Sequence, residues 1–341
     1  MERILIDEQS EVVIERGLTA GNILPARSNR DVVAVFTQPG ATRIADVVAA
    51  QLNAPVVRQM VLPDREDAKT LAVTEAAYEW LAEIGMSRHG TVVGVGGGSV
   101  TDLAGFVAAT YLRGVEVVHV PTTLLGAVDA AIGGKTGVNL GGKNLVGAFH
   151  HPTRVVIDLD VLDRLPVGLK REGMAEALKA GLIGDRSLFK HLESAGLEAD
   201  LALVVPKAVK VKAAAVRQDF REAGIRETLN YGHTIGHAVE IVAAIPHGDA
   251  VAIGMVAAGR IAEEAVGFAS ADRQRCAIIN LGLPVRADGL ARQTVLDVLA
   301  RDKKRDATGT RMVLLRSIGD PTVSAVSIEM IDLGLSSIGI G

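Results

Sequence analysis

Short apolar runs rich in β-branched residues alternate with amphipathic stretches along the first half of the chain. The runs occupy residues 32–36, 55–62, 91–95, 116–120 and 154–158. Between them, apolar residues recur at helical spacing in residues 42–52, 67–84 and 100–112. Strands that alternate with helices of this length are typical of a parallel sheet covered by helices. The pattern therefore predicts an α/β fold with a mostly parallel sheet, Rossmann-like but not of the standard form.

The strand pattern ends near Pro166, and helical spacing dominates the second half. Helices are predicted over residues 171–183, 201–220, 226–242, 250–266 and 293–300. Residues 311–315 and 322–326 predict a small pair of strands. We therefore expect two domains, 1–160 and 161–341, with the boundary inside residues 159–166. A cleft between two domains is a common place for a ligand site.

Composition and charge exclude several classes of protein. Of the 341 residues, 48% are hydrophobic and 22% charged, which describes a folded globular chain. The net charge of −4 gives no global basic field to attract nucleic acid or anionic lipid. Cys276 is the single cysteine, so an intrachain disulfide is excluded. The charged N-terminus and the short apolar stretches predict neither a signal peptide nor a membrane span, and we expect a cytoplasmic protein.

A glycine-rich turn follows the predicted strand at residues 91–95. Gly96, Gly97, Gly98 and Ser99 lead directly into an apolar helix, where backbone N–H groups and the helix dipole can hold an anion such as a pyrophosphate. Ser99 stands where the usual dinucleotide fingerprint has its last glycine, so a turn that only packs the helix on the sheet is the alternative. Asp102, in the first helical turn, would repel a phosphate and is better suited to binding a hydroxyl group.

A second segment rich in glycine and lysine follows the predicted strand at residues 116–120. It runs through Thr122, Thr123 and Asp129 to five glycines, two lysines and two asparagines between residues 133 and 144. A solvated loop would have a similar composition. Its place after the carboxyl end of a sheet strand, the usual ligand side of an α/β sheet, favours a second anion site.

Histidines cluster in the helical half. His233 and His237 are four residues apart and share one helix face, His247 follows, and Glu176 lies on an earlier helix. Two or three histidines with one carboxylate suit a divalent metal, zinc above all, with a position open for substrate. The spacing leaves open whether His237 is a ligand or handles a phosphate or a proton.

Further candidate basic residues occur in the same half of the chain. They are Lys179, Lys212, Arg226 and the run Lys303, Lys304 and Arg305. Taken alone, the run is typical of a solvated turn and Lys212 of an ordinary helix surface.

Together these segments resemble the 3-dehydroquinate synthase family of sugar-phosphate cyclases. The matching segments are Pro63-Asp64-x-Glu66-x-x-Lys69, residues 96–105, 111–114, 120–125, 133–137 and 142–149, Ala175-Glu176-x-x-Lys179, residues 229–237, His247-Gly248 and Asp302-Lys303-Lys304. The resemblance implies an N-terminal NAD-binding α/β domain, a helical metal-binding domain, a homodimer and an active site in the cleft between the domains.

The resemblance also implies roles for individual residues. NAD would be bound by Asp64, Glu66, Lys69, Gly97, Gly98, Ser99, Val100, Thr101, Asp102, Thr122, Thr123, Lys135, Lys143, Val161, Leu162, Asp163 and Arg164. One zinc or cobalt ion would be bound by Glu176, His233 and His247. Substrate contacts or catalysis would fall to Asp129, Lys135, Asn144, Lys179, Lys212, Arg226, Asn230, His237, Lys303 and Lys304, with Arg113 reaching the phosphate site of a partner subunit.

The family reaction converts 3-deoxy-D-arabino-heptulosonate 7-phosphate to 3-dehydroquinate and phosphate. It implies transient oxidation of a hydroxyl by NAD, elimination of phosphate, return of the hydride, ring opening and aldol closure. Three alternatives stay open: a related cyclase acting on an amino analogue or another sugar phosphate, a metal-dependent polyol dehydrogenase of the glycerol dehydrogenase type, and a homologue that binds without catalysing.

Overall fold

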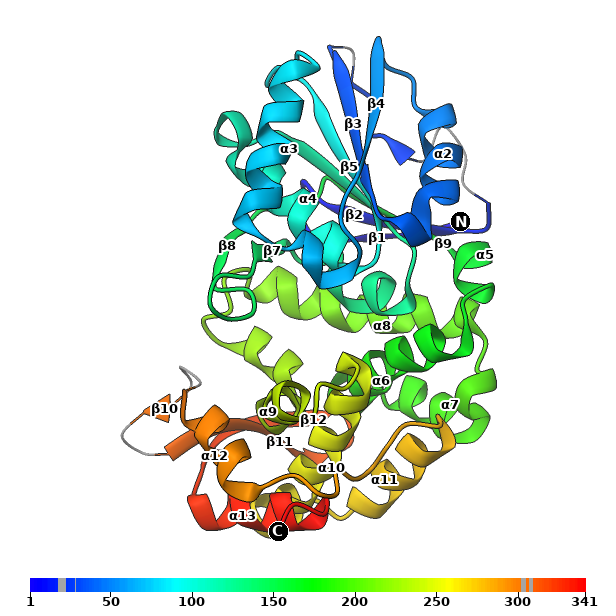
Figure 1. Ribbon diagram of the computed structural model, residues 1–341. Coiled ribbons are helices and arrows are strands. Elements are labelled where there is room, and N and C mark those ends of the chain that lie inside the picture. The colour runs from blue at the N-terminus through cyan, green and yellow to red at the C-terminus, as the bar shows by residue number, and fades with distance from the viewer. Residues whose placement is uncertain (18–22, 28, 302–304, 307–308) are drawn as a thin grey trace. The chain divides into compact units, whose positions relative to one another are not determined.

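The computed structural model describes residues 1–17, 23–27, 29–301, 305–306 and 309–341 (Figure 1). The chain divides into two compact units. Unit 1 contains Met1–Pro166 together with Lys212–Arg221, and unit 2 contains Val167–Val211 and Glu222–Gly341. Residues Lys212–Arg221 come from the second half of the chain but belong to unit 1. A single boundary along the sequence therefore does not separate the two units.

Unit 1 is built on a seven-stranded sheet in the order β1-β2-β9-β6-β5-β3-β4. The strands are β1 (Glu2–Leu5), β2 (Glu11–Glu15), β3 (Val32–Thr37), β4 (Val56–Val61), β5 (Thr91–Gly96), β6 (Glu116–Pro121) and β9 (Arg154–Asp158). Only β1 and β2 pair antiparallel, and all other neighbours are parallel. The predicted fold class and its five strands are confirmed. The sequence pattern missed β1 and β2, because each is only four or five residues long and two of its residues are charged.

Helices cover both faces of this sheet. They are α2 (Thr42–Gln51), α3 (Leu71–Glu83), α4 (Gly98–Thr110) and the short α5 (Leu159–Asp163). Val33 and Val35 pack with α2 on one face, while Ala34 and Phe36 of the same strand pack with α3 and α4 on the other (Figure 1). Burial on both faces explains why these strands are continuous apolar runs rather than alternating ones.

The carboxyl ends of the parallel strands meet at one edge of the sheet. The segments that leave this edge contain Gln38 after β3, Pro63 after β4, Gly97 after β5, Thr122 after β6 and Leu159 after β9. A hairpin of β7 (Lys135–Val138) and β8 (Val146–Phe149) follows β6 and packs on α4. Most of the residues that the resemblance assigns to NAD therefore follow the carboxyl ends of this sheet, where ligands of α/β sheets bind.

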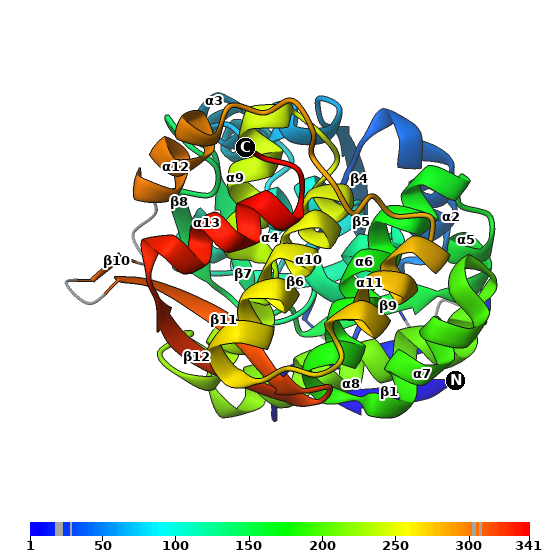
Figure 2. The same cartoon turned by 90° about the horizontal axis from the view of Figure 1, so that it is seen from below.

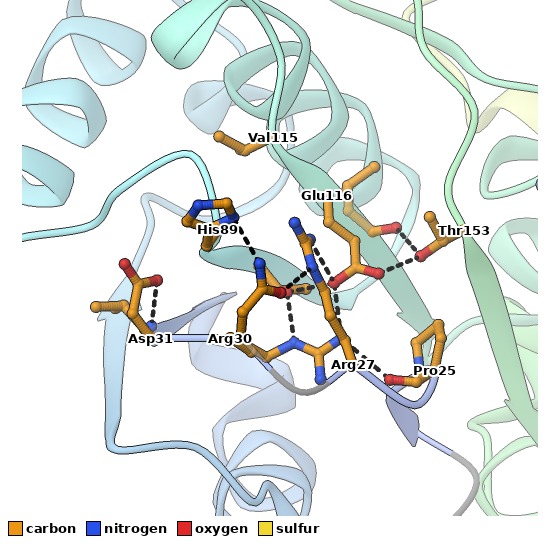
Figure 3. A network of polar contacts seen from close by, with 12 residues as sticks. Pro25, Arg27, Arg30, Asp31, His89, Val115, Glu116 and Thr153 are labelled. Atoms are coloured by element: carbon orange, nitrogen blue, oxygen red, sulfur yellow. Dashed lines mark hydrogen bonds and ion pairs between the residues drawn. The ribbon is translucent and has the colours of Figure 1, made fainter.

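The opposite edge is tied together by a buried ion-pair network (Figure 3). Arg30 donates from Nη2 to Glu116 at 2.7 Å and from Nε to the Thr91 hydroxyl at 2.8 Å, and Thr153 donates to the other Glu116 oxygen at 3.4 Å. These residues stand at the amino ends of β3, β5, β6 and β9, so one network pins four strand starts.

Two predicted helix starts differ in detail from the structure. The helix predicted from residue 67 is a 3-10 turn, Arg65–Ala68, followed by α3 from Leu71, because Thr70 is extended and caps α3 through its hydroxyl (3.1 Å from the Val73 N–H). The helix predicted over 226–242 is a 3-10 turn, Ile225–Asn230, then α9 (His233–Ala243). Gly232 separates the two with a left-handed φ of +79°.

Unit 2 is mostly helical. Its elements are α6 (Val167–Gly184), α7 (Arg186–Ala195), the first part of α8 (Leu201–Gln218), α9, α10 (His247–Val266), α11 (Ala271–Asn280), α12 (Arg292–Arg301), α13 (Ile328–Ser337) and a three-stranded sheet of β10 (Arg305–Asp306), β11 (Gly309–Ser317) and β12 (Asp320–Val326). The predicted strand pair is the β11–β12 hairpin, whereas α7, α11 and α13 were not predicted. Helix α10 packs against α6, α9, α11 and α13 and lies among them in Figure 2. In the described part of the chain, no helix is both long enough and apolar enough to cross a membrane.

Candidate functional site

Three potential metal ligands meet inside unit 2. Glu176 lies in α6, and His233 and His247 are the first residues of α9 and α10. Their ligand atoms all lie within 4.8 Å of one another. Glu176 Oε1 is 3.4 Å from His233 Nε2 and 3.3 Å from His247 Nε2. The residues that the resemblance assigns to the metal are thus brought together from three helices.

Close contact between α9 and α10 holds the two histidines near each other. A Cβ on Gly254 of α10 would lie 2.0 Å from the Gly232 carbonyl oxygen, and one on Gly236 of α9 would lie 2.9 Å from the Ala250 oxygen. Any side chain at these positions would push the helices apart. Gly232 and Gly236, which are next to His233 and His237 in the sequence, therefore serve the packing that assembles the cluster.

Each histidine ring is oriented through its Nδ1 atom. His233 Nδ1 lies 3.1 Å from the Tyr231 carbonyl oxygen, and His247 Nδ1 lies 3.1 Å from Glu240 Oε2. Both rings consequently turn Nε2 toward Glu176. Two Nε2 atoms and one carboxylate oxygen, with acceptors behind the rings, are a donor set that fits zinc or a similar divalent ion with a position left for substrate.

Charge stabilises Glu176 as a carboxylate. Burial by itself would raise the pKa of Glu176, but contact with the Lys179 ammonium and with both histidines outweighs burial and holds this pKa well below its usual range. Lys179 lies one turn further along α6, and its side chain is only 4% exposed. Glu176 is therefore ionised and able to coordinate a cation at neutral pH.

His237 lies beside this cluster, with its ring centroid 5.1 Å from that of His233 and 5.9 Å from that of His247. His237, Glu240 and His247 form a second group whose ligand atoms lie within 4.8 Å of one another. This group shares His247 with the first, and in it Glu240 already faces the His247 ring. The more buried set of Glu176, His233 and His247 is the better metal centre.

In unit 1, the glycine-rich turn begins α4 without a side-chain cap in the described structure. Gly97 is the N-cap residue, and Ser99 exchanges hydrogen bonds with Gln38 at 3.2 and 3.4 Å. Gln38 also donates to the carbonyl oxygens of Pro63 and Arg65 at 3.1 and 2.9 Å. The turn is thus fixed to the segment after β4. The N-terminus of α4, which has no side-chain cap, follows the carboxyl end of β5, and this arrangement fits a pyrophosphate.

The other residues assigned to NAD surround this edge. Thr122 donates its N–H to the Gly96 oxygen at 2.9 Å, and the Thr123 hydroxyl accepts from the Gly126 N–H at 3.1 Å. Val100 and Thr101 are buried in α4. Val161 and Leu162 belong to α5, where Asp163 pairs with Arg16 at 2.7 Å and Arg164 ends the helix.

A polar network joins the segment after β4 to the β7–β8 hairpin. The Lys69 ammonium donates to Asp102 Oδ2 at 2.7 Å and to Asn144 Oδ1 at 2.5 Å. Asn139 donates from Nδ2 to Glu66 Oε2 at 2.9 Å, and its Oδ1 accepts from the Asn144 N–H at 2.9 Å. Asp64 is exposed beside this network, as is Lys143.

The remaining predicted residues fall in several places. Lys212, on the part of α8 that belongs to unit 1, donates to Asp129, at 2.6 Å from its backbone oxygen. Lys135 is exposed at the start of β7, and Arg113 is exposed in the turn after α4. In unit 2, Arg226 is almost fully buried, and Asn230 donates to Glu222 at 3.0 Å. Lys303 and Lys304 lie outside the described residues.

Sequence reasoning missed four residues that shape these sites: Gln38, Asn139, Glu240 and Gln274. Gln38 could have been found, since it directly follows a predicted strand at the ligand edge. Gln274 accepts from the buried Tyr231 hydroxyl at 2.6 Å and donates to the Met255 oxygen at 2.6 Å, which fixes the residue whose carbonyl faces His233. Its place on α11 carries no local signal of that role.

Comparison with known families gives matches over most of the chain. The profile of the 3-dehydroquinate synthase N-terminal domain matches residues 59–172, and that of the 3-dehydroquinate synthase C-terminal domain matches residues 173–305. The 3-dehydroquinate synthase of Saccharopolyspora erythraea is 42% identical over 94% of this chain and 90% of its own. That of Mycobacterium leprae is 42% identical over 94% of this chain and 92% of its own.

Solved structures agree with this similarity. 2-Deoxy-scyllo-inosose synthase, crystallised with carbaglucose-6-phosphate, NAD+ and Co2+, is 25% identical with a TM-score of 0.88 over 98% of this chain and 99% of its own. 2-Epi-5-epi-valiolone synthase from Streptomyces hygroscopicus, with NAD+ and Zn2+ bound, is 28% identical with a TM-score of 0.85 over 98% of both chains. An iron-containing alcohol dehydrogenase from Thermococcus thioreducens, at 15% identity and a TM-score of 0.67, shares the fold alone.

Proposed function

The chain belongs to the 3-dehydroquinate synthase family, and we propose that it converts 3-deoxy-D-arabino-heptulosonate 7-phosphate to 3-dehydroquinate and phosphate. The observation that carries this proposal is the set of Glu176, His233 and His247, whose ligand atoms converge in a chain with an uncapped glycine-rich turn at the ligand edge of its sheet.

The candidate metal-binding residues would hold one divalent ion that binds the sugar. Glu176, His233 and His247 would hold a divalent cation, with Glu240 and the Tyr231 carbonyl keeping the two rings in place. When bound, NAD supplies a reversible hydride acceptor and the ion polarises the hydroxyl that is oxidised. Lys179, next to Glu176, adds a buried positive charge beside these ligands.

The residues at the ligand edge of unit 1 would hold NAD. Backbone N–H groups at Gly98 and Ser99 suit the pyrophosphate, while Asp102 and the threonines Thr122 and Thr123 suit hydroxyl and amide groups of the cofactor. NAD held there would supply a hydride acceptor that gives the hydride back within each turnover, and it would be needed in catalytic amounts only.

The phosphate group of the substrate would be bound by charge-assisted donors. Lys135, Asn144, Arg226 and His237 are the residues proposed for this task. Oxidation acidifies the neighbouring C–H bond, and the departing phosphate takes that proton as its C–O bond breaks, which leaves a carbon–carbon double bond. Asp129 with Lys212, and Asn230, would hold the polyol hydroxyls.

Incubation of the pure protein with the heptulosonate phosphate, catalytic NAD and Zn2+ tests the function. We expect release of phosphate with equimolar 3-dehydroquinate and no net NADH. An absence of phosphate release from fully metal-loaded protein would overturn the proposal. A parallel assay with the amino analogue separates the synthase from a related cyclase, and steady NADH formation from glycerol without phosphate release would indicate a polyol dehydrogenase instead.

Three features implied by the family stay predictions. They are a homodimer in which Arg113 contacts the partner's phosphate site, the placement of the active site between the two domains, and a cytoplasmic location. Sedimentation of the wild type and of an Arg113→Ala variant would test the first, since that variant should lose activity while it stays dimeric.

A further inference from the structure

Lys69 is assigned to NAD by resemblance, yet the structure places its charge against protein groups. The side chain is only 4% exposed. Its ammonium donates to Asp102 Oδ2 at 2.7 Å and to Asn144 Oδ1 at 2.5 Å. A lysine buried in this way has little surface to offer a ligand, so its main partners are Asp102 and Asn144.

The contact with Lys69 determines which end of the Asn144 amide faces outward. An ammonium group can only donate hydrogen bonds, so the Asn144 carbonyl oxygen must face Lys69. The NH2 group of Asn144 then points away from Lys69, on an exposed residue of the hairpin. Asn144 therefore presents two N–H hydrogen-bond donors, which can bind an oxyanion but not a cation.

Asn139 holds the backbone of the same residue. Its Oδ1 accepts from the Asn144 N–H at 2.9 Å, its Nδ2 donates to Glu66 at 2.9 Å, and its own N–H donates to the Lys69 carbonyl oxygen at 2.8 Å. Asn144 adopts a φ of +54°, a left-handed conformation that asparagine tolerates better than most residues. Two side chains and one unusual backbone angle thus fix a single side-chain amide.

We propose that Lys69 and Asn139 are positioning residues that present the Asn144 amide NH2 group to an oxyanion of the substrate. Asp102 takes part by holding the Lys69 ammonium. The proposal rests on the proposed function, because the oxyanion it needs is the phosphate or the carboxylate of the heptulosonate phosphate. Neither Lys69 nor Asn139 has to touch a ligand for this role.

A double-mutant cycle between Lys69→Met and Asn144→Ala tests the link. We expect K69M alone to raise the KM for the heptulosonate phosphate, and the Kd for inorganic phosphate measured by titration, by about tenfold, as expected for one misplaced charge-assisted donor. In the N144A background, K69M should raise these two constants by less than twofold, because the amide that Lys69 positions is absent.

Asn139→Ala provides a second variant, which keeps the buried Lys69–Asp102 pair intact and so tests the proposal even if K69M unfolds. It should raise the same KM and Kd by about fivefold, and it should change neither of them in the N144A background. Lys190→Met and Asn53→Ala, at exposed positions outside these sites, are the matched controls.

Equal effects of N139A, or of K69M, in the wild-type and N144A backgrounds would overturn the inference. Failure of the proposed function is distinguishable, because it appears in the wild type as absent turnover, whereas the cycle on inorganic phosphate binding needs no turnover.

Discussion

The His247 ring lies between two carboxylates, with Nδ1 3.1 Å from Glu240 and Nε2 3.3 Å from Glu176. Burial alone would lower the pKa of His247, but hydrogen bonds to both carboxylates raise it to about 10. A divalent ion that binds Nε2 displaces the proton there, and the remaining Nδ1 proton stays on the side of Glu240. Glu240 thereby fixes both the tautomer and the orientation of this ligand.

Substitution of Glu240 should weaken metal binding. We expect Glu240→Ala to lower Zn2+ affinity by about tenfold to 100-fold, the usual effect of losing a partner behind a ligating histidine. Glu240→Gln should lose less Zn2+ affinity, because the amide oxygen of the glutamine still accepts a hydrogen bond from His247 Nδ1. Competition with a coloured chelator measures both affinities, with Glu264→Ala on exposed α10 surface as the control. Unchanged affinity in E240A would contradict the role of this carboxylate.

Glu176 and Lys179 should show a stability effect separate from metal binding. Glu176→Gln leaves the buried Lys179 ammonium without its carboxylate, which costs about 3 kcal/mol or more in the metal-free protein. The double variant Glu176→Gln with Lys179→Met should regain most of that stability but bind no metal. Urea unfolding and metal analysis after dialysis measure the two properties. Recovery of metal binding in the double variant would exclude Glu176 as a ligand.

The contact between α9 and α10 predicts a further stability effect. A Cβ at position 254 would lie 2.0 Å from the Gly232 oxygen, so Gly254→Ala should destabilise the fold by about 1–3 kcal/mol and weaken metal binding by separating His233 from His247. In α6, the structure has open space around an added Cβ at position 168, so Gly168→Ala should raise the free energy of unfolding by about 0.5 kcal/mol. Thermal unfolding with and without Zn2+ compares the two, and equal stabilities would show that the helices are not held by this contact.

The sheet could be predicted from the sequence because each central strand is a short run of apolar, β-branched residues. Val33, Val35, Val93 and Val118 are buried β-branched residues in runs bounded by turns, and both faces of each strand are covered. The interruption at Gly232 was harder to predict, since a glycine within a helical pattern is often tolerated. The contact with α10 shows why a glycine stands there: a Cβ on Gly232 would lie 2.6 Å from Met255 Cγ and 3.0 Å from the Val251 oxygen.

The candidate metal ligands could be predicted as a group from the sequence, but the role of each residue could not. His233 and His237 share a helix face, so their spacing could not separate a ligand from a neighbour. The structural difference comes from Glu176 and Tyr231, which face His233. Contacts such as Lys69 with Asn144, 75 residues apart, depend on how a hairpin packs against a helix and have no local signal.

His119 predicts how stability depends on pH in unit 1. It lies in β6, opposite Gly94 of β5, and a Cβ on Gly94 would come within 3.1 Å of its Nδ1 atom. In the described part of the chain that Nδ1 has no hydrogen-bond partner. Burial, with a smaller contribution from His150, lowers the pKa of His119 to about 3.

The folded protein therefore keeps His119 neutral at pH values where the unfolded chain protonates it. Below the unfolded pKa of about 6.5 the unfolded state binds the extra proton, so this residue lowers the free energy of unfolding as pH falls from about 6.5 toward 3. The loss approaches about 1.4 kcal/mol per pH unit. Above pH 7 the effect vanishes.

Urea unfolding of the wild type and of His119→Gln between pH 4.5 and 8 isolates this contribution. We expect the stability of the variant to fall less steeply below pH 6.5, by about 1 kcal/mol per pH unit, whatever its stability at pH 8. Comparing slopes rather than absolute values removes the packing cost of the substitution and the titration of all other groups. Parallel curves for the two proteins would mean that His119 accepts its proton in the folded state as readily as in the unfolded chain.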